Sequence, residues 1–381
     1  MSRITRLRPA AFLAAVLALS LLVAAGCGSS SSKTSSSSSA ASTTGSAKGG
    51  IAVLLPDSKS SVRWETQDRP SLDKAFTAAG IPHTIVNAQG DAAAQRTQAD
   101  QALTNGAKVI LLVDLDAGSG ASIIKAAHAK GAKVIDYDRL TLGGGADYYT
   151  SFDNQRVGKL QGQGLVKCLS GRTKPVVATL NGSPTDNNAT LFADGYNSIL
   201  KPLYANGTFT KGPNQSVPEW DNQKALTIYE QMLQSTSNKI NGVLAANDGL
   251  ANSVISAQQA RKLPKIPVTG QDATAQGIQH ILAGDQCMTV YKNVNKEAAA
   301  AANVAIALAK GQTPASTATL DNNSGKPVAS GTTGATPATL LTPEAVTKAN
   351  IANTVIKDGF LKPSDICTGT YAQYCKAAGI Q

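Results

Sequence analysis

The stretch at residues 108–140, KVILLVDLDAGSGASIIKAAHAKGAKVIDYDRL, contains the repeating unit from which the fold can be worked out. It begins with an apolar run, KVILLV, continues with an alanine-rich helical segment at residues 121–130, and ends with a second apolar run, KVIDY. Two apolar runs separated by an amphipathic helix are typical of a β-α-β unit. In such a unit the two strands are parallel and the helix covers one face of the sheet.

The same unit recurs from Gly50 onward, and it restarts once. Apolar runs IAVLLP and HTIVNA precede helical segments at 70–79 and 92–104. After YYTSFDN the order is helix 154–169, strand PVVATLNG, helices 186–203 and 224–235, strand GVLAAND, helix 249–261, strand PVTG, helix 274–283 and strand CMTVYK. Roughly 330 residues are too many for one such sheet, and the restart near Ser151 indicates two lobes. We predict an α/β fold in which each lobe is a parallel sheet flanked by helices. The helix at 295–310 and the segment LLTPEAVTKANIANTVIKDGF supply further crossings between the lobes.

The N-terminus predicts export and anchoring. Residues 1–26 combine Arg3, Arg6 and Arg8 with an apolar run at 9–25, which is typical of a signal peptide and too short for a spanning helix. The run ends in AAGC, which resembles a bacterial lipobox whose cysteine, Cys27, is lipidated. Ala24 stands where leucine is usual, so an ordinary signal peptide with an incidental Cys27 is the alternative. Serine-rich residues 27–49 predict a disordered tether, and we expect a protein anchored at the outer face of the cell membrane, or a periplasmic one.

Charge and histidine patterns argue against nucleic acid and metal. The formal net charge is +10, but three of the basic residues belong to the signal and the others are spread along the chain. A nucleic-acid groove needs clustered Lys and Arg with interleaved aromatic residues. The three histidines are scattered and the cysteines form no CxxC pattern, so no metal site is expected.

Cysteine usage predicts two disulfides. Lipidation of Cys27 leaves Cys168, Cys287, Cys367 and Cys375, and an even number in an exported protein favours disulfides, of which three pairings are possible. Cys367 and Cys375 are eight positions apart, whereas Cys168 ends the first helix of the second lobe and Cys287 begins the strand that leaves it. We expect the pairs Cys168–Cys287 and Cys367–Cys375, with buried free thiols as the alternative.

Hydrogen-bonding residues follow almost every predicted strand. They are Arg63, Trp64, Asp114, Asp116, Asp138, Arg139, Asn187, Asn188, Asn247, Asp248, Asp272 and Lys292. A polar loop is ordinary at any single strand end. The carboxyl ends of parallel strands share one edge of a sheet, however, and that edge is where open α/β sheets bind ligands. Their coincidence predicts a binding site.

The residue types favour binding of a neutral, hydroxyl-rich ligand over catalysis. No histidine follows a strand to serve a nucleophile, and the chain has neither a GxGxxG turn after a strand nor a P-loop, so we expect no catalytic residue and no cofactor. Asp138 and Asp272 are conceivable as paired glycosidase carboxylates, but nearby cations and amides would lower the pKa that a general acid needs. Carboxylates that accept, cations that donate and amides that do both suit sugar hydroxyls, and Trp64 and Trp220 can stack on the apolar face of a sugar ring.

Several segments together resemble a known family. SVRWETQDR, VIDYDRL, YYTSFDNQRVGKLQ, GSPTDNNATLF, LAANDG, VTGQDAT, MTVYK and TVIKDGF are similar, in order and spacing from about Gly50 to Lys362, to the periplasmic sugar-binding proteins of ABC importers. Within this family the D-xylose-binding members are the most similar. The resemblance implies the two-lobe, type I periplasmic binding protein fold, in which a multi-strand hinge joins the lobes and the sugar lies between them. It also implies a monomer that captures D-xylose or a related monosaccharide and delivers it to an ABC permease with its ATPase.

Carried over residue by residue, the resemblance implies a ligand set. This set is Arg63, Trp64, Asp138, Arg139, Asn188, Trp220, Asn247, Asp272 and Lys292. The implied N-terminal lobe is 50–151 with 291–330, the C-terminal lobe is 152–290 with 331–366, and 367–381 is a tail without a counterpart.

Three departures from the family pattern leave some points open. Asp136 replaces an apolar residue and may be structural, the loop before Arg63 differs, and the four cysteines are additions. A protein of the same fold that hands its closed state to a kinase or chemoreceptor is the alternative function. An intracellular repressor is excluded by the signal segment and by the lack of an N-terminal helix-turn-helix.

Overall fold

A seven-stranded sheet forms the centre of the N-terminal lobe in the computed structural model, which describes residues 50–380. The strand order is β10-β11-β5-β4-β3-β1-β2, and every neighbouring pair is parallel except β10 with β11. The strands are β1 (Ile51–Leu55), β2 (His83–Asn87), β3 (Val109–Leu112), β4 (Lys133–Tyr137), β5 (Tyr148–Phe152), β10 (Ala318–Asp321) and β11 (Ala335–Leu341). The helices of this lobe are α1 (Arg69–Ala78), α2 (Ala92–Thr104), α3 (Ala117–Ala129) and α9 (Val294–Ala309), and α1 follows a helical turn at Trp64–Asp68.

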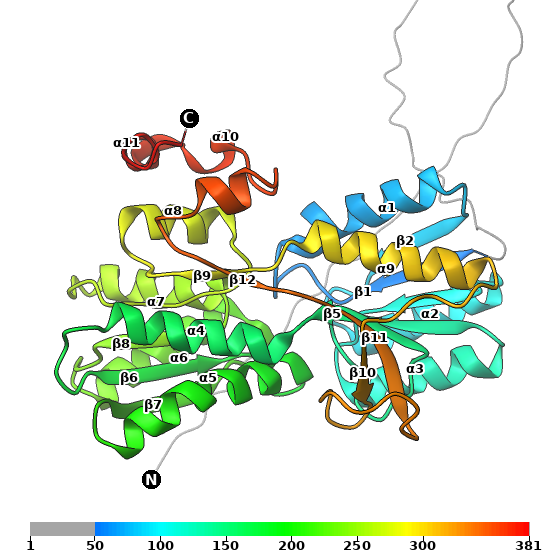
Figure 1. The fold of residues 1–381 in the computed structure, drawn as a ribbon, viewed down its shortest axis with the longest axis horizontal. Helices are drawn as coiled ribbons and strands as arrows, with labels where there is room; N and C mark the ends of the chain where they lie inside the picture. The colour runs from blue at the N-terminus through cyan, green and yellow to red at the C-terminus, as the bar shows by residue number, and fades with distance from the viewer. Residues whose placement is uncertain (1–49, 381) are drawn as a thin grey trace, which may run out of the picture. The chain divides into compact units, whose positions relative to one another are not determined.

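Alternation along the central strands explains why both faces of this sheet are covered. Ile51, Val53 and Leu55 pack in the cluster that contains α1 and α9, whereas Ala52 and Leu54 pack in the cluster that contains α2 and α3. Successive side chains of a strand point to opposite faces, so a strand without polar positions must be buried on both. The β-α-β unit predicted at 108–140 is β3-α3-β4 (Figure 1).

The C-terminal lobe has a smaller parallel sheet of order β7-β6-β8. Its strands are β6 (Val176–Asn181), β7 (Thr210–Ser216) and β8 (Gly242–Ala245), and its helices are α4 (Asn154–Cys168), α5 (Asn187–Ala205), α6 (Asn222–Ser235), α7 (Asp248–Ala260) and α8 (Ala275–Ala283). The predicted strand PVTG is reduced to a single bridge between Val268 and Val243. β7 was not predicted, because its sequence TKGPNQS is polar and its side chains are mostly exposed.

The chain passes between the lobes at three places in the described part. They lie between β5 and α4, between β9 (Thr289–Tyr291) and α9, and between β11 and β12 (Glu344–Val346). β9 and β12 pair with each other in an antiparallel ribbon. β11 pairs with β5, so the N-terminal lobe extends through Leu341 and the prediction that 331–341 belongs to the C-terminal lobe is wrong. The third crossing follows β11 rather than preceding it.

The C-terminal tail packs on α8. It contains α10 (Pro363–Ile366), a helical turn at Gly369–Tyr371 and α11 (Ala372–Ala377). Ile366, Cys375 and Ile380 belong to an apolar cluster with Ile278 and Ile281 of α8. Both α10 and α11 lie beside α8 (Figure 1). The amide of Gln279 in α8 also donates to the backbone carbonyl of Ile366 over 3.1 Å.

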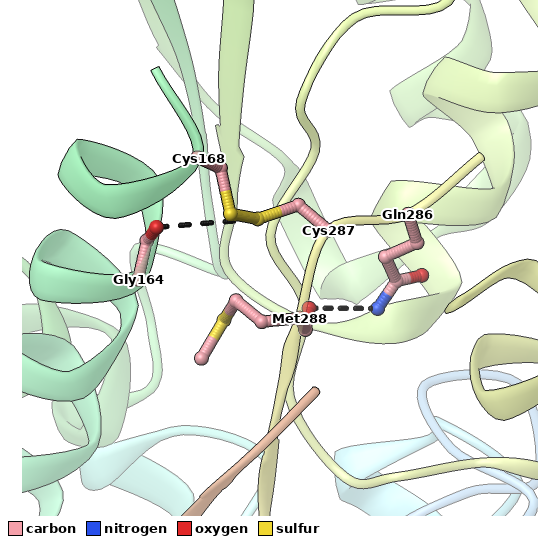
Figure 2. The surroundings of a disulfide bond; sticks show 5 residues. All are labelled: Gly164, Cys168, Gln286, Cys287 and Met288. Carbon is pink, nitrogen blue, oxygen red and sulfur yellow. Dashed lines mark hydrogen bonds between the residues drawn. A yellow bond between two sulfur atoms is a disulfide. The ribbon is translucent and has the colours of Figure 1, made fainter. Parts of the chain in front are cut away.

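Two disulfides join the four cysteines of the described part. Cys168 at the end of α4 pairs with Cys287 just before β9, with Cα atoms 6.4 Å apart (Figure 2). Cys367 pairs with Cys375 within the tail, with Cα atoms 5.7 Å apart. These are the two pairs that were predicted from the positions of the cysteines in the sequence. The first lies within the C-terminal lobe and the second within the tail, so neither links the two lobes.

Candidate functional site

A cavity of about 350 Å³, partly open to solvent, lies between the two lobes. Its lining includes all nine residues of the predicted ligand set: Arg63, Trp64, Asp138, Arg139, Asn188, Trp220, Asn247, Asp272 and Lys292. The first four come from the N-terminal lobe, the next four from the C-terminal lobe, and Lys292 from the crossing between β9 and α9. The fold therefore brings together residues that are more than 200 positions apart in sequence, because both sheets direct strand ends toward this space.

Arg63 is the centre of a buried ion-pair network. Its Nε and Nη2 atoms donate to both carboxylate oxygens of Asp68, over 2.9 and 2.7 Å. Nη1 donates to Oδ2 of Asp138 over 2.8 Å, and Nη2 also donates to Oε2 of Glu297 over 2.6 Å. The Tyr137 hydroxyl donates to Asp68 as well. A guanidinium held by three carboxylates has little freedom to reorient, so it is preorganised for a ligand.

Asp138 and Asp272 face the ammonium group of Lys292. Nζ of Lys292 lies 3.7 Å from Oδ2 of Asp138 and 3.6 Å from Oδ1 of Asp272. Burial raises the pKa of Asp138, but Lys292, Arg63 and Arg139 together lower it below its ordinary value. The pKa of Lys292 is raised, because the attraction of Asp138 and Asp272 outweighs the effect of burial. Asp138 and Lys292 are consequently charged at neutral pH, one as acceptor and one as donor.

The chain's two tryptophans lie on the cavity wall, one from each lobe. The Arg63 guanidinium lies 4.4 Å from the ring centroid of Trp64, a distance suited to a cation–π contact. The indole N–H of Trp220 donates to Oδ2 of Asp186 over 3.1 Å, and its ring meets Phe192 at 6.4 Å between centroids. Both indoles are fixed, and each contributes apolar area to a cavity whose other lining residues are mostly polar or charged.

Asn188 and Asn247 stand at the starts of two helices of the C-terminal lobe. The Asn188 side chain donates to the backbone carbonyl of Asp138 over 2.9 Å, which links the two lobes directly. Oδ1 of Asn247 accepts from the backbone N–H of Leu250 over 2.9 Å and so caps α7. The cap fixes the orientation of this amide, which lines the cavity.

Three cavity residues have left-handed backbone conformations. Asp138, Trp220 and Asp272 have φ values of 63°, 55° and 94°. For non-glycine residues such angles cost on the order of 1–3 kcal/mol, and they cluster where surrounding structure imposes them for function. Asp138 directly follows β4, Trp220 ends a helical turn at Pro218–Trp220, and Asp272 follows the isolated bridge at Gln271.

Five further residues line the cavity and were not predicted. They are Ser60, Ser61, Asp186, Phe192 and Gln271. Asp186 caps α5 by accepting from the Asn188 N–H over 2.9 Å and lies 3.3 Å from Nε of Arg139, so it joins the two lobes. Its position directly before Asn187 and Asn188 was a usable signal, but a cap is the ordinary explanation of an aspartate there. Phe192 lies one turn into α5, and no sequence signal separated it from a core residue.

Other polar residues after strands do not line this cavity. Asp116 caps α3 by accepting from the Ser119 N–H over 2.9 Å. Asp136 is buried and accepts from both the backbone N–H and the hydroxyl of Thr141, so its position fits a structural role. Burial also raises the pKa of Asp136 well above its ordinary value.

The described residues hold no cluster of three or more histidine, cysteine, aspartate or glutamate side chains suited to a metal ion. Residues 50–380 also contain no helix with the length and apolar character needed to cross a membrane.

Comparison with known proteins agrees with this architecture. Among curated relatives, a D-xylose-binding periplasmic protein of Escherichia coli (strain K12) is 37% identical over 317 residues, which cover 83% of this chain and 92% of that protein. A multiple sugar-binding periplasmic receptor of Rhizobium radiobacter is 32% identical, with 84% and 92% covered. A solved carbohydrate transporter solute binding protein from Chloroflexus aurantiacus, in complex with D-glucose, is 30% identical with a TM-score of 0.74, and the match covers 83% of this chain and 97% of that one.

A family model described as the periplasmic binding protein domain matches residues 51–313. This range includes all nine residues of the predicted ligand set, and it contains most of both lobes. The relatives named above are transport or receptor proteins rather than enzymes. The chain belongs to the periplasmic binding protein family.

Proposed function

We propose that this protein captures a monosaccharide in the cavity between its lobes and delivers it to an ABC permease with its ATPase. The single observation that carries the proposal is the cavity lining, where buried carboxylates, cations, amides and two indoles from both lobes face one small space. Such a set can accept from and donate to every hydroxyl of a sugar while the indoles cover its C–H surface.

D-xylose is the sugar we propose. The support is the 37% identity to curated D-xylose-binding periplasmic proteins of Escherichia coli and Haemophilus influenzae. The competing ligand is D-glucose, which is bound in solved relatives at 30% and 26% identity. A hexose adds a hydroxymethyl group, so the space beside the ring would separate the two sugars.

A ligand that contacts both lobes favours the closed arrangement by its differential contacts, which is the basis of hinge closure. Arg63, Asp138 and Arg139 would hold the sugar from the N-terminal lobe, and Asn188, Asn247 and Asp272 from the C-terminal lobe.

We further propose that Cys27, outside the described residues, carries a lipid anchor and that residues 27–49 tether the domain to the outer membrane face.

The experiment is a thermal-shift screen followed by isothermal titration calorimetry. D-xylose, D-glucose, L-arabinose and myo-inositol are compared, since a ligand that binds only the native state raises the melting temperature. We expect the largest shift with D-xylose. A larger shift with another sugar would correct the ligand, and no shift with any monosaccharide would overturn the proposed function.

A further inference from the structure

Glu297 does not line the cavity, but it contacts Arg63, which does. It lies in the first turn of α9 and is fully buried. Its Oε2 atom accepts from Nη2 of Arg63 over 2.6 Å. Its Oε1 atom is also buried and has no hydrogen-bond partner among the described residues. A buried carboxyl with one bonded and one unbonded oxygen calls for an explanation, because such groups are almost always fully paired.

The hydrogen bonds of Arg63 show what Glu297 contributes. A guanidinium has five N–H donors. Asp68 takes Nε–H and one hydrogen of Nη2, Glu297 takes the other hydrogen of Nη2, and Asp138 takes one hydrogen of Nη1. One Nη1 hydrogen is left, on a residue that lines the cavity. Asp68 and Glu297 thus fix the guanidinium plane and, with it, the direction of the donor available to a ligand.

The charges around Glu297 favour a proton on it. Its neighbours are Arg63 and Asp68 at the first helical turn, Asp138, Tyr137 and Tyr149 on or after β4 and β5, and Lys292 before α9. Among the charges that act directly on this group, two cations face three carboxylates: Arg63 and Lys292 against Asp68, Asp138 and Glu297 itself. Burial raises the pKa of Glu297 to about 8, although Arg63 pulls it down.

We propose that Glu297 is a positioning residue of the sugar site and takes up a proton from solvent when the cleft closes on a sugar. The proton goes to Oε1, because Oε2 accepts from Arg63, and the carboxylate becomes a neutral acid that still holds the guanidinium. Closure removes water from the cleft and so disfavours the excess negative charge. This inference rests on the proposed function and adds a proton-linked step to it.

Proton linkage gives the proposal its first test. Titration of wild-type protein with D-xylose, and with D-glucose as a second probe, is repeated at pH 8 in two buffers of different ionisation enthalpy. We expect uptake of a fraction of one proton per sugar, and an affinity that falls between pH 7 and pH 9 by up to about tenfold per pH unit. Glu297→Gln should bind with no proton uptake from this group and a flatter pH profile.

The matched control is Asp136→Asn, which removes another buried N-terminal-lobe carboxyl with a raised pKa. Because Asp136 contacts Thr141 and not Arg63, this variant should keep the wild-type proton uptake. Wild-type binding without proton uptake would overturn the proposal, even if no Glu297 variant folds. Unchanged uptake in Glu297→Gln would overturn it equally.

The positioning role is tested at pH 7 with two variants. Glutamine retains an oxygen that accepts from Arg63 and an NH2 group in place of the acid O–H, so Glu297→Gln should bind within about threefold of wild type. Alanine frees one edge of the guanidinium, and Glu297→Ala should lose about tenfold or more in affinity, the loss expected for a hydrogen bond to a charged group. Equal affinity of the two variants would contradict positioning. Failure of wild-type protein to bind either sugar would instead overturn the proposed function together with this inference.

Discussion

Asp272 lies in the cavity with Oδ1 at 3.6 Å from Nζ of Lys292, and this buried oxygen accepts no hydrogen bond from the described residues. An oxygen left without a partner in a preorganised site is available to a ligand hydroxyl. Asp272→Ala should therefore weaken D-xylose binding about tenfold to a hundredfold, on the order of 1.5–3 kcal/mol for a hydrogen bond to a charged group. Calorimetric titration measures this loss.

The control for Asp272→Ala is Asp285→Ala in the same lobe. Asp285 pairs with the exposed Lys265 over 2.7 Å, is itself mostly buried, and does not line the cavity. Its removal should leave the affinity unchanged. Equal affinities of the two variants would remove Asp272 from the ligand set.

Asp248 makes the stability of the C-terminal lobe depend on pH. It is fully buried at the start of α7, where burial raises its pKa to about 7 despite hydrogen bonds from Gln286, Thr274 and Thr289. An unfolded aspartate has a pKa of about 4, so between about pH 4 and pH 7 the unfolded chain loses this proton before the folded one does. The stabilisation that Asp248 provides is present in full below about pH 4 and is lost as the pH rises through about 7.

Asp248→Asn should flatten that dependence. The free energy of unfolding of the wild type should fall by about 2–4 kcal/mol between pH 4.5 and pH 7.5 through this group, and by less in the variant. The variant should also be less stable at every pH, because an amide NH2 would face donors that now point at a carboxylate oxygen. Urea denaturation at both pH values measures the difference. An identical slope for both proteins would show that Asp248 is ionised throughout this range.

The nine predicted ligand residues line one cavity. Most of them directly follow apolar runs in the sequence, and the fold brings the ends of those strands together. A polar residue directly after an apolar run is visible in the sequence, and parallel sheets place such residues together. Asp186 and Phe192 lack that signal, because the first is a helix cap and the second has the spacing of a core residue. Gln271 directly follows the predicted strand PVTG but was passed over in favour of its neighbour Asp272. Glu297 was missed because it lies in the first turn of a helix and not directly after a strand.

At the level of elements, the disulfide between α4 and β9 closes a much longer loop than the one in the tail. The two cysteines are 119 positions apart in the first bond and 8 in the second. Loop-closure entropy predicts stabilisation of about 5 kcal/mol for the long loop and about 2.5 kcal/mol for the short one. Cys168→Ser with Cys287→Ser should therefore destabilise the protein more than Cys367→Ser with Cys375→Ser.

Denaturant melts of the two double variants test this order. Met288 follows Cys287 and packs against Gly164 of α4, so apolar contact persists when the long disulfide is removed (Figure 2). Sugar affinity should change little in the tail variant, whose cysteines lie away from the cavity lining. A larger loss of stability in the tail variant would show that the tail, and not loop length, dominates.

The regular alternation of strands and helices could be predicted from the sequence, whereas the irregular strand pairings could not. β1 and β3 are continuous apolar runs buried on both faces, which is the pattern of central parallel strands. β7 is polar at an exposed sheet edge, and β11 joins the N-terminal sheet from late in the chain through its pairing with β5. Such pairings are set by tertiary contacts and leave no local pattern in the sequence.

For the whole molecule, the position of Cys27 predicts where the protein resides. Cys27 lies outside the described residues, behind a serine-rich segment that cannot bury a core. Cys27→Ala should move the protein from the membrane fraction to the soluble fraction, because the proposed lipid would be attached to this cysteine. Fractionation followed by immunoblotting measures this shift, and D-xylose affinity should stay the same. Retention of the variant on the membrane would mean that the signal is not cleaved.

The placement of the two tryptophans has an optical consequence. The whole chain contains only Trp64 and Trp220, and both line the cavity, one in each lobe. All of its tryptophan fluorescence therefore originates at the site where the lobes meet. Arrival of a sugar changes the polarity around both indoles at once, while the nine tyrosines provide a separate ultraviolet background. The unlabelled protein is thus its own optical reporter, and excitation at the red edge of the indole band would follow ligand capture in real time.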